Sequence, residues 1–301
     1  MLLKKIEPSD MCAIIVTYHP DSLFYERVLA ISSQVGNVFI VDNGSNRDAE
    51  KMLRNINQSP SINIIFNNEN LGIAKALNIG ISLAEKNGYQ FAILFDQDSK
   101  PNKDLAANLC KIYSAHPNTE KIALIGANYD NVLKNAEKKP SHQLNAKCEW
   151  HEVKRVITSG SLLSFTAYQK IGPFREDFFI DLVDIEYCMR ARKLGYSILR
   201  SNRVLMLHSI GYPSKHLLFG KTIWATNHTA IRRYYYARNY VAIQREYGNY
   251  ILGWWAIKSL KKCIRQSFII ILFEQHKLDN LAAIAKGWWH GMNNKMGQYS
   301  L

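Results

Sequence analysis

Residues 91–99 read FAILFDQDS, and this stretch decides how the rest of the chain is interpreted. Five apolar residues are followed by two aspartates, Asp96 and Asp98, with one residue between them. A short apolar run bounded by polar residues is typical of a buried strand. The stretch therefore predicts a strand over 91–95 whose carboxyl end presents two carboxylates.

The sequence on either side of this strand repeats the same pattern. Apolar, β-branched runs predict four more strands, at 12–17 (CAIIVT), 38–41 (VFIV), 62–66 (INIIF) and 122–126 (IALIG). Apolar residues at helical spacing predict helices over 21–34 and 71–86. Because strands that alternate with helices form βαβ units, we expect an α/β fold with a mostly parallel sheet and helices on both faces.

Polar residues follow these strands at the points where the strands end. In an open parallel sheet the ligand lies beyond the carboxyl ends of the strands. The polar residues at four successive ends are Thr17 and Tyr18, Asp42 and Asn43, 67–70 including Asn70, and Asp96 and Asp98. Four consecutive strands of this kind predict a binding site along one edge of the sheet.

Two features of this edge have more than one explanation. Paired carboxylates suit a hard divalent cation, Mg²⁺ or Mn²⁺, but an aspartate shortly before Pro101 is also a good turn or helix cap. Residues 70–80 (NLGIAKALNIG) place Gly72 and other small residues at the start of a helix. Such a start admits a phosphate group, or simply packs tightly against the sheet.

Composition limits the class of protein. The formal net charge of +13 over 301 residues favours an anionic partner such as nucleic acid, acidic lipid or a phosphorylated substrate. Five scattered cysteines, never spaced as CxxC, argue against a structural zinc site or a disulfide framework. The N-terminus lacks the apolar core of a signal peptide, and no apolar run approaches the roughly 20 residues of a membrane span. We therefore expect a cytoplasmic protein.

The second half of the chain is less regular. Residues 156–163 (VITSGSLL) predict a strand, a tight turn and an apolar segment. Residues 184–194 predict an amphipathic helix, and 198–207 a final strand or hairpin closed by His208. Acidic residues at the helix start either carry out chemistry or stabilise the helix through its dipole, and we favour the second role for Glu186.

Seven of these segments occur in an order that points to one family. They are IIVTYHPD, FIVDNGS, NENLGIAKALNIG, FDQDS, TSGSLL, DLVDIEYCMR and LHSIG. Over residues 12–239 the chain resembles the family 2 glycosyltransferases, which have the Rossmann-like GT-A fold, and it looks most like the rhamnosyltransferases that build bacterial surface polysaccharides. Single motifs of this kind are weak, whereas seven in order are specific.

The resemblance implies a role for each matched residue. The nucleotide-binding residues would be Thr17, Tyr18, Asp42, Asn43, Asn70, Gly72, Asn78 and Asp96. Asp98 and His208 would hold the divalent metal, Mn²⁺ or Mg²⁺, and Asp184 would be the catalytic base. Ser159, Gly160 and Asp181 would contact the acceptor or the sugar, and Arg233 and Arg238 the diphosphate. Many relatives have Glu-Asp where this chain has Val183-Asp184, so the preceding acid is missing.

The resemblance also implies a reaction. The expected enzyme transfers L-rhamnose from dTDP-rhamnose, with inversion, to a lipid-linked intermediate of a cell-surface polysaccharide of the O-antigen type. Three alternatives stay open. The donor could be another nucleotide sugar, such as UDP-galactose or UDP-galactofuranose; the chain could be a sugar nucleotidyltransferase; or the Arg/Tyr cluster at 232–239 could bind RNA. Given the acidic residues along the sheet edge, we expect no nucleic-acid partner.

We expect a catalytic domain over 1–240 and a basic helical segment over 241–301. In a helix over 251–273, one face would carry Lys258, Lys261, Lys262 and Arg265, and the opposite face would be apolar. Such a helix suits an anionic membrane surface at the inner face of the cell membrane. It could instead pack on the core or on a second copy of the chain.

Overall fold

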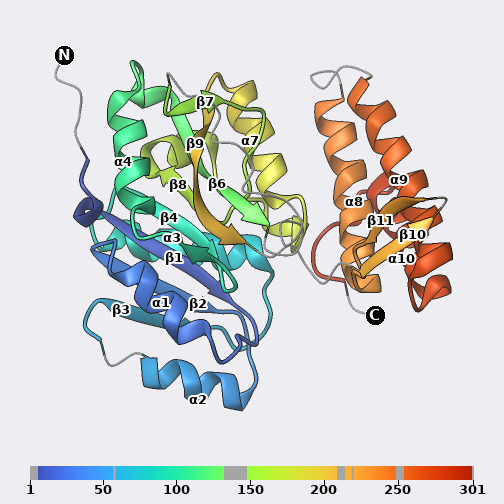
Figure 1. Cartoon of the computed structure of the whole chain (residues 1–301), viewed down its shortest axis with the longest axis horizontal. Helices are drawn as coiled ribbons and strands as arrows, with labels where there is room; N and C mark the ends of the chain where they lie inside the picture. The colour runs from blue at the N-terminus through green and yellow to red at the C-terminus, as the bar shows by residue number, and fades with distance from the viewer. Residues whose placement is uncertain are drawn as a thin grey trace. The chain divides into compact units, whose positions relative to one another are not determined.

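The chain forms two compact units (Figure 1). The structure is a computed structural model, and it describes residues 6–56, 59–131, 148–208, 214–218, 220–248 and 254–299. Unit 1 contains Met1–Glu176 and Asp184–His208, and unit 2 contains Asp177–Val183 and Ser209–Leu301. The expected boundary at residue 240 lies inside helix α8 (Ala230–Tyr247), so the units divide earlier in the chain than the sequence suggested.

Unit 1 is an α/β structure, as the alternation of strands and helices predicts. Its strands are β1 (Met11–Thr17), β2 (Asn37–Asp42), β3 (Ile62–Phe66), β4 (Phe91–Asp96), β5 (Lys100–Pro101), β6 (Ile122–Asn131), β7 (Trp150–Glu152), β8 (Ser161–Ser164) and β9 (Ser197–His208). Its helices are α1 (Phe24–Ser32), α2 (Arg47–Ile56), α3 (Ile73–Lys86), α4 (Leu105–Ala115), α6 (Phe165–Ile171) and α7 (Val183–Lys193). Short 3₁₀ turns at Pro8–Asp10 and Thr119–Lys121 complete it, and a third, Glu176–Phe178, lies where the chain passes from unit 1 to unit 2.

The sheet has nine strands, with the order β3-β2-β1-β4-β8-β6-β9-β5 and with β7 paired to β9. Strands β3, β2, β1 and β4 run parallel, which confirms the predicted parallel part. Strand β8 is antiparallel to both β4 and β6. The parallel register places Thr17 beside Asp42 and Val16 beside Asp96, so the polar residues that end these strands meet at one edge.

One prediction for the second half of unit 1 needs correction. The strand expected at the start of 156–163 does not form, whereas the expected tight turn lies at Gly160 (φ +72°) and the apolar segment after it is β8. The strand expected over 198–207 is confirmed as β9, whose pairing with β6 contains register shifts. Helices α2, α4 and α6 were not predicted.

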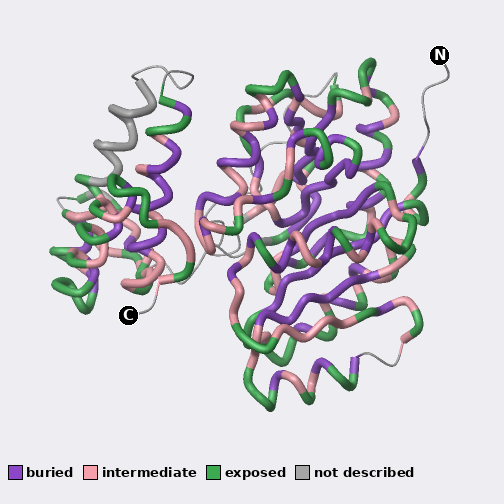
Figure 2. Tube along the Cα trace, turned by 180° about the vertical axis from the view of Figure 1, so that it is seen from behind, coloured by how far each residue is buried: buried purple, intermediate pink, exposed green. Residues whose placement is uncertain are grey.

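The core lies on both faces of the sheet, and Figure 2 shows that the residues of the central strands are buried. Every residue of β1 is buried. Ala13 and Ile15 join the apolar cluster that includes α1 and α4, whereas Ile14 points to α3 on the other face. A Cβ atom on Gly80 of α3 would lie 2.5 Å from Ile14 Cγ2, so the small residues of this helix allow it to pack directly on the sheet.

Unit 2 is mainly helical. It contains the two-stranded sheet of β10 (Ser214–Leu218) and β11 (Lys221–Ala225), and the helices α8 (Ala230–Tyr247), α9 (Trp254–Phe273) and α10 (Lys277–Met292). Helices α8 and α10 pack closely because a Cβ on Gly287 would lie 2.3 Å from the Tyr234 carbonyl oxygen, and one on Gly291 2.7 Å from that of Arg238. In the described part of the chain, no helix combines the length and apolar character needed to cross a bilayer.

Candidate active site

Asp42 is the centre of a buried polar group at the carboxyl edge of the sheet. It is 2% exposed, and its Oδ1 accepts hydrogen bonds from Thr17 Oγ1 (2.9 Å) and Ser45 Oγ (2.5 Å). Its Oδ2 accepts the backbone N–H of Ser45 at 3.0 Å. These three donors fix the carboxylate at the end of β2, and their hydrogen bonds compensate for its burial.

Asn43 joins this group to the start of α3. Its Nδ2 donates to Asn70 Oδ1 at 2.9 Å, and its Oδ1 accepts the backbone N–H of Leu71 at 3.1 Å. Asn70 Oδ1 in turn accepts the N–H of Gly72 at 3.0 Å, where the backbone has φ +85°. The structure therefore brings Thr17, Asp42, Asn43, Asn70 and Gly72 into one connected network, as the sequence predicts.

The two aspartates of FDQDS lie in a tight turn at the end of β4. The Ser99 N–H donates to the Asp96 carbonyl oxygen at 3.2 Å, and the Asp96 N–H donates to Ser159 Oγ at 3.3 Å. Gln97, between the aspartates, accepts the backbone N–H of Tyr18 on its Oε1 at 2.7 Å. The acidic turn is thus bonded to the end of β1, which adds Tyr18, Asp96 and Asp98 to the same edge.

Strand β5 holds the acidic turn from its other side. Lys100 pairs antiparallel with Leu207 of β9, so the backbone of His208 lies opposite the turn, one residue beyond this pair. The side chain of His208 lies outside what the structure describes, and its role in metal binding stays a prediction.

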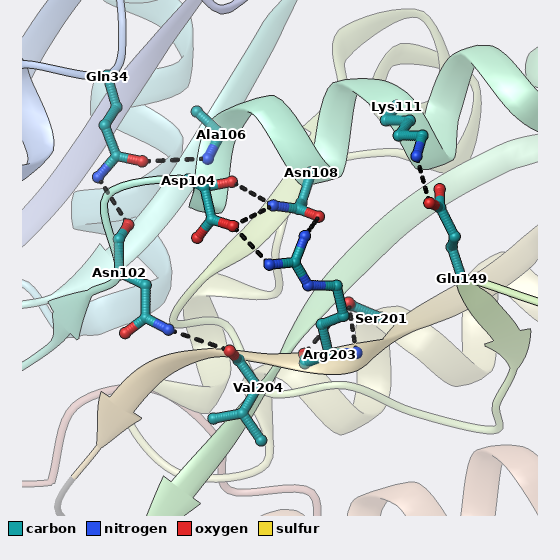
Figure 3. Close-up of polar contacts among 10 residues, drawn as sticks. All are labelled: Gln34, Asn102, Asp104, Ala106, Asn108, Lys111, Glu149, Ser201, Arg203 and Val204. Carbon is teal, nitrogen blue, oxygen red and sulfur yellow. Dashed lines mark hydrogen bonds and ion pairs between the residues drawn. The ribbon is translucent and has the colours of Figure 1, made fainter. Parts of the chain in front are cut away.

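A polar cluster behind β5 fixes it against β9 (Figure 3). Asn102 donates its backbone N–H to the Leu205 carbonyl (2.8 Å) and its Nδ2 to the Val204 carbonyl (3.0 Å). The Arg203 guanidinium binds Asp104 Oδ2 at 2.8 Å and Asn108 Oδ1 at 2.7 Å, both near the start of α4. We refer to Asn102, Asp104, Asn108 and Arg203 as the β5 clamp, because they anchor the strand that leaves the acidic turn.

The donor set at the acidic turn fits a divalent cation that is shared with a phosphorylated ligand. Among the residues that the structure describes, no group of three or more His, Cys, Asp or Glu side chains gathers into a complete metal site. Two carboxylates are nevertheless a sufficient protein contribution for Mg²⁺, since this ion is commonly bound by one or two carboxylates together with substrate phosphates and water. A single carboxylate of this turn, such as that of Asp98, therefore suits a metal whose coordination is completed by diphosphate oxygens and water.

The acidic residues around the start of α7 differ in their surroundings. Glu186 is fully buried and forms a two-point ion pair with Arg190, at 3.0 Å for both Nε and Nη2. This pair confirms a structural role for Glu186. Asp184 is half-buried, and its Oδ1 accepts the backbone N–H of Ile185 at 2.8 Å. Burial raises the pKa of the nearby Cys188 thiol to about 12, so this cysteine is no nucleophile at neutral pH.

Asp181 belongs to unit 2, where Arg232 of α8 binds its carboxylate through two hydrogen bonds, Nη2–Oδ1 at 2.8 Å and Nε–Oδ2 at 3.3 Å. Its side chain is 16% exposed. The charge of this aspartate is already balanced, which suits a residue that orients a ligand more than one that removes a proton.

Several predicted site residues have another role in the structure. Ser159 is completely buried beneath the acidic turn, where its hydroxyl bonds Ser99 and Asp96, so it supports the turn and does not face an acceptor. Gly160 fills a position where a Cβ would lie 2.4 Å from Met206 Sδ. The side chain of Asn78 bonds Tyr168 Oη at 2.8 Å and the backbone of Phe174, and it therefore fixes the segment after α6.

Arg233 and Arg238 also require correction. Arg233 is 5% exposed and pairs with the buried Glu274, and Arg238 is 1% exposed and bonds the carbonyl oxygens of Asp177 and Phe178. Guanidinium groups that are buried and bonded in this way are not available to a diphosphate. The structure therefore removes both from the expected diphosphate site.

Three residues that the sequence interpretation missed support this edge. Ser45 donates to Asp42, Gln97 accepts from Tyr18, and Arg27 Nη1 donates to the Gln97 carbonyl at 3.2 Å. Arg27 also binds Asp21 and, mainly through this hydrogen bond, holds the pKa of that carboxyl below its usual value. Ser45 and Gln97 lie inside the motifs FIVDNGS and FDQDS, so the sequence could have indicated that they belong to the site. No motif includes Arg27, so the sequence could not have indicated its role.

Comparison with known proteins agrees with this arrangement. Residues 12–172 match the family model described as glycosyl transferase family 2. The chain is 27% identical over 280 residues to the dTDP-rhamnosyl transferase RfbF of Shigella flexneri, covering 90% of this chain and 91% of that protein. Both findings confirm the resemblance that the ordered motifs indicated.

Solved structures with the same fold have much lower sequence identity. The crystal structure of S. aureus TarS 1-349 aligns with a TM-score of 0.51 and 16% identity, over 66% of this chain and 60% of that one. The crystal structure of GalNAc-T7 with UDP, GalNAc and Mn2+ aligns with a TM-score of 0.57 and 13% identity, over 80% and 48%. The chain thus spans less than two thirds of either solved chain, and at these identities the likeness establishes the fold. With the GT-A fold in place and more than half of its length matched by the family model, the chain belongs to glycosyl transferase family 2.

Proposed function

We propose that this glycosyltransferase moves L-rhamnose from dTDP-rhamnose, with inversion, to a lipid-linked intermediate of a cell-surface polysaccharide. The observation that carries the proposal is the connected edge of β1, β2 and β4, where Asp42 and the acidic turn of Asp96 and Asp98 are held by their neighbours. The donor is chosen because RfbF, a relative along nearly the whole chain, is a dTDP-rhamnosyl transferase.

In this proposal the donor lies along the carboxyl edge of the sheet. Asp42 accepts a hydrogen bond from the nucleobase, and Asp96 binds the ribose. Asp98, together with His208, holds the divalent metal, which when bound neutralises charge that develops on the departing diphosphate. The Asp42 carboxylate already accepts three hydrogen bonds, and a carboxylate has about four acceptor positions, so room for a ligand donor remains.

Asp184 is the proposed general base. The acceptor hydroxyl oxygen attacks the anomeric carbon, the bond from that carbon to the diphosphate oxygen breaks, and dTDP leaves with the electron pair. The hydroxyl proton passes to the Asp184 carboxylate, which must lie within about 2.6–3.2 Å of that hydroxyl. The resemblance to the family implies a base at Asp184, whereas the neighbouring Glu186 is ion-paired with Arg190 and Asp181 with Arg232, which makes these two acids less suited to accept a proton.

Binding of dTDP compounds is expected to stabilise the folded protein in a metal-dependent manner. A ligand present at about 100 times its Kd raises the free energy of unfolding by about 2.7 kcal/mol, because it binds only the folded state. The thermal midpoint should be measured with dTDP, dTDP-rhamnose, UDP, UDP-galactose and GDP, each with Mn²⁺, with Mg²⁺ and with EDTA. The largest shift is expected with dTDP-rhamnose and metal.

The same panel contains the results that would contradict the proposal. A shift with UDP compounds alone would retain the transferase but change its donor. No shift with any nucleotide would count against a preformed donor site at this edge.

We further propose that α9 contacts an anionic membrane surface, which would bring the enzyme to a lipid-linked acceptor. Four large apolar side chains of this helix are exposed at helical spacing: Ile264 (62%), Phe268 (60%), Ile271 (48%) and Leu272 (42%). The net charge of +13 favours anionic lipid. The expected basic face at Lys258, Lys261 and Lys262 lies outside the described side chains.

Vesicle binding tests this part of the proposal. The protein is expected to sediment with vesicles that contain phosphatidylglycerol and not with vesicles of phosphatidylcholine alone. The double change Phe268→Ser and Ile271→Ser should abolish sedimentation, because it removes apolar area that would enter the interface. The control is Leu194→Ser, which alters an apolar side chain of unit 1 that is 49% exposed and should bind as wild type does. Equal binding of all three proteins would remove α9 from the proposal.

A further inference from the structure

Residues 178–182 belong to the short segment of unit 2 that directly precedes α7, and their backbone is unusual. Phe179, Asp181 and Leu182 all have positive φ, at 63°, 64° and 63°. Each non-glycine residue in this region costs about 1–3 kcal/mol, and such strain persists only where surrounding contacts enforce it. The contacts that enforce it therefore identify the residues that determine this conformation.

One amide of α8 supplies most of that support. Asn239 is fully buried, and its Nδ2 lies 2.9 Å from the carbonyl oxygens of Phe178, Ile180 and Asp181. Arg238 Nε donates to Asn239 Oδ1 at 3.0 Å. Because the amide oxygen is taken by a donor, the NH₂ group of Asn239 is oriented toward the three carbonyls.

Other contacts from α8 and from the end of the chain hold the same segment. Arg238 Nη2 donates to the carbonyl oxygens of Asp177 (2.8 Å) and Phe178 (3.1 Å). The Phe179 ring stacks on Tyr235 with centroids 5.0 Å apart. Gly297 donates its N–H to the Asp177 carbonyl at 2.8 Å and accepts a hydrogen bond from Arg238 Nη1.

We propose that Arg238 and Asn239 are positioning residues, which hold 177–183 in the strained conformation that orients Asp181 and sets the backbone from which Asp184 extends. Val183 is the first residue of α7, so the chain passes directly from the supported segment to the proposed base. The inference rests on the proposed function, and it replaces the diphosphate role that the sequence suggested for Arg238.

The test is Asn239→Asp, which keeps the shape of the side chain and replaces the donating NH₂ by an oxygen that faces three carbonyl oxygens. The kcat for release of dTDP from dTDP-rhamnose, with water as acceptor, is expected to fall about 100-fold, as for a misplacement of about 1 Å. The KM for dTDP-rhamnose should stay within about twofold, because the donor edge is built from β1, β2 and β4. Amide hydrogen exchange over 178–184 should become faster.

The matched control is Gln244→Glu, the same amide-to-acid change five residues further along α8. The Nε2 atom of Gln244 is buried and has no hydrogen-bond partner. If Asn239 had a purely structural role, Asn239→Asp and Gln244→Glu would have the same kcat when their thermal midpoints are equal. That result would overturn the inference. So would a rise in donor KM at unchanged kcat.

A second variant covers the case in which Asn239→Asp does not fold. Arg232→Gln removes the ion pair with Asp181 from the same face of α8, at a side chain that is 42% exposed. This variant should fold, and its kcat should be lower while the KM for dTDP-rhamnose is unchanged. Its amide hydrogen exchange over 178–184 should be faster. If neither kcat nor amide exchange changed, the inference would be overturned. If the wild-type protein neither binds dTDP compounds in the thermal assay nor releases dTDP from dTDP-rhamnose, the proposed function fails by itself. Amide hydrogen exchange over 178–184 in Asn239→Asp and Arg232→Gln then decides whether α8 holds the segment.

Discussion

Asp184→Asn is expected to lower kcat for dTDP-rhamnose by about 10²–10⁴-fold, the usual contribution of a general base. The amide has nearly the same shape as the carboxylate and can still accept the hydrogen bond from the Ile185 N–H. It cannot take up the proton of the acceptor hydroxyl. Donor affinity should be unchanged, since Asp184 does not belong to the network around Asp42.

Asp98→Ala should also abolish turnover, but for a different reason that a binding measurement can separate. Loss of this carboxylate is expected to remove the metal-dependent part of dTDP binding, so that the thermal shifts with Mn²⁺ and with EDTA become equal. Asp184→Asn should retain the difference. The control is Asp48→Asn, an exposed acid in the first turn of α2. Wild-type turnover in both the Asp98 and the Asp184 variants would reject the assigned roles.

Glu274→Ala is expected to destabilise unit 2 by about 3–5 kcal/mol, because it leaves a buried guanidinium without its partner. The side chains of Arg233 and Glu274 are 4% and 3% exposed. Arg233 Nε has no hydrogen-bond partner of its own, so the Glu274 carboxylate is the main compensation for its burial. Equilibrium urea unfolding, followed by tryptophan fluorescence, measures the change in the free energy of unfolding.

A double substitution distinguishes two quantities: the net contribution of this ion pair to the free energy of unfolding, and the free energy lost when only one partner is removed. Arg233→Met with Glu274→Leu replaces both charges by apolar groups, and the double variant should be close to wild type or more stable. The reference is Glu50→Ala in α2, whose partner Arg54 is 62% exposed, and there the expected loss is under about 1 kcal/mol. A double variant as unstable as the single one would show that packing, and not charge, sets the stability there.

The parallel half of the sheet and its polar edge were predictable, because each strand is a short apolar run that ends in polar residues. That pattern is local, because apolar runs and polar residues alternate along the chain. The register of β1, β2 and β4 then aligns the apolar runs, so that they are buried together on both faces of the sheet. The assignment of Ser159 failed for a related reason. A serine in a motif that matches the family resembles a ligand-binding residue in the sequence, but whether it points outward or beneath the neighbouring turn depends on how β8, which follows it, pairs with β4.

The arginines of RRYYYARN could not be placed from the sequence. A mixture of cations and aromatic rings is typical of a surface that binds anions, whereas here α8 buries Arg233, Tyr235, Arg238 and Asn239 together. The role of Arg238 and Asn239 is decided by the carbonyl oxygens that they reach, which belong to residues about 60 positions earlier in the chain. The role of Arg233 is decided by Glu274, 41 positions later. No local pattern reports such a pairing.

The support of 177–183 by α8 and by Gly297 has a consequence for the nascent chain. Arg238 is synthesised 61 residues after Asp177, and Gly297 a further 59 residues later. At about 5–20 residues per second, this segment waits on the order of 10 s on the ribosome for its last contact. The backbone beside Asp184 therefore acquires its final form only after Gly297 has been synthesised, so a nascent chain that stops short of this residue can already contain the donor edge while it still lacks an oriented base.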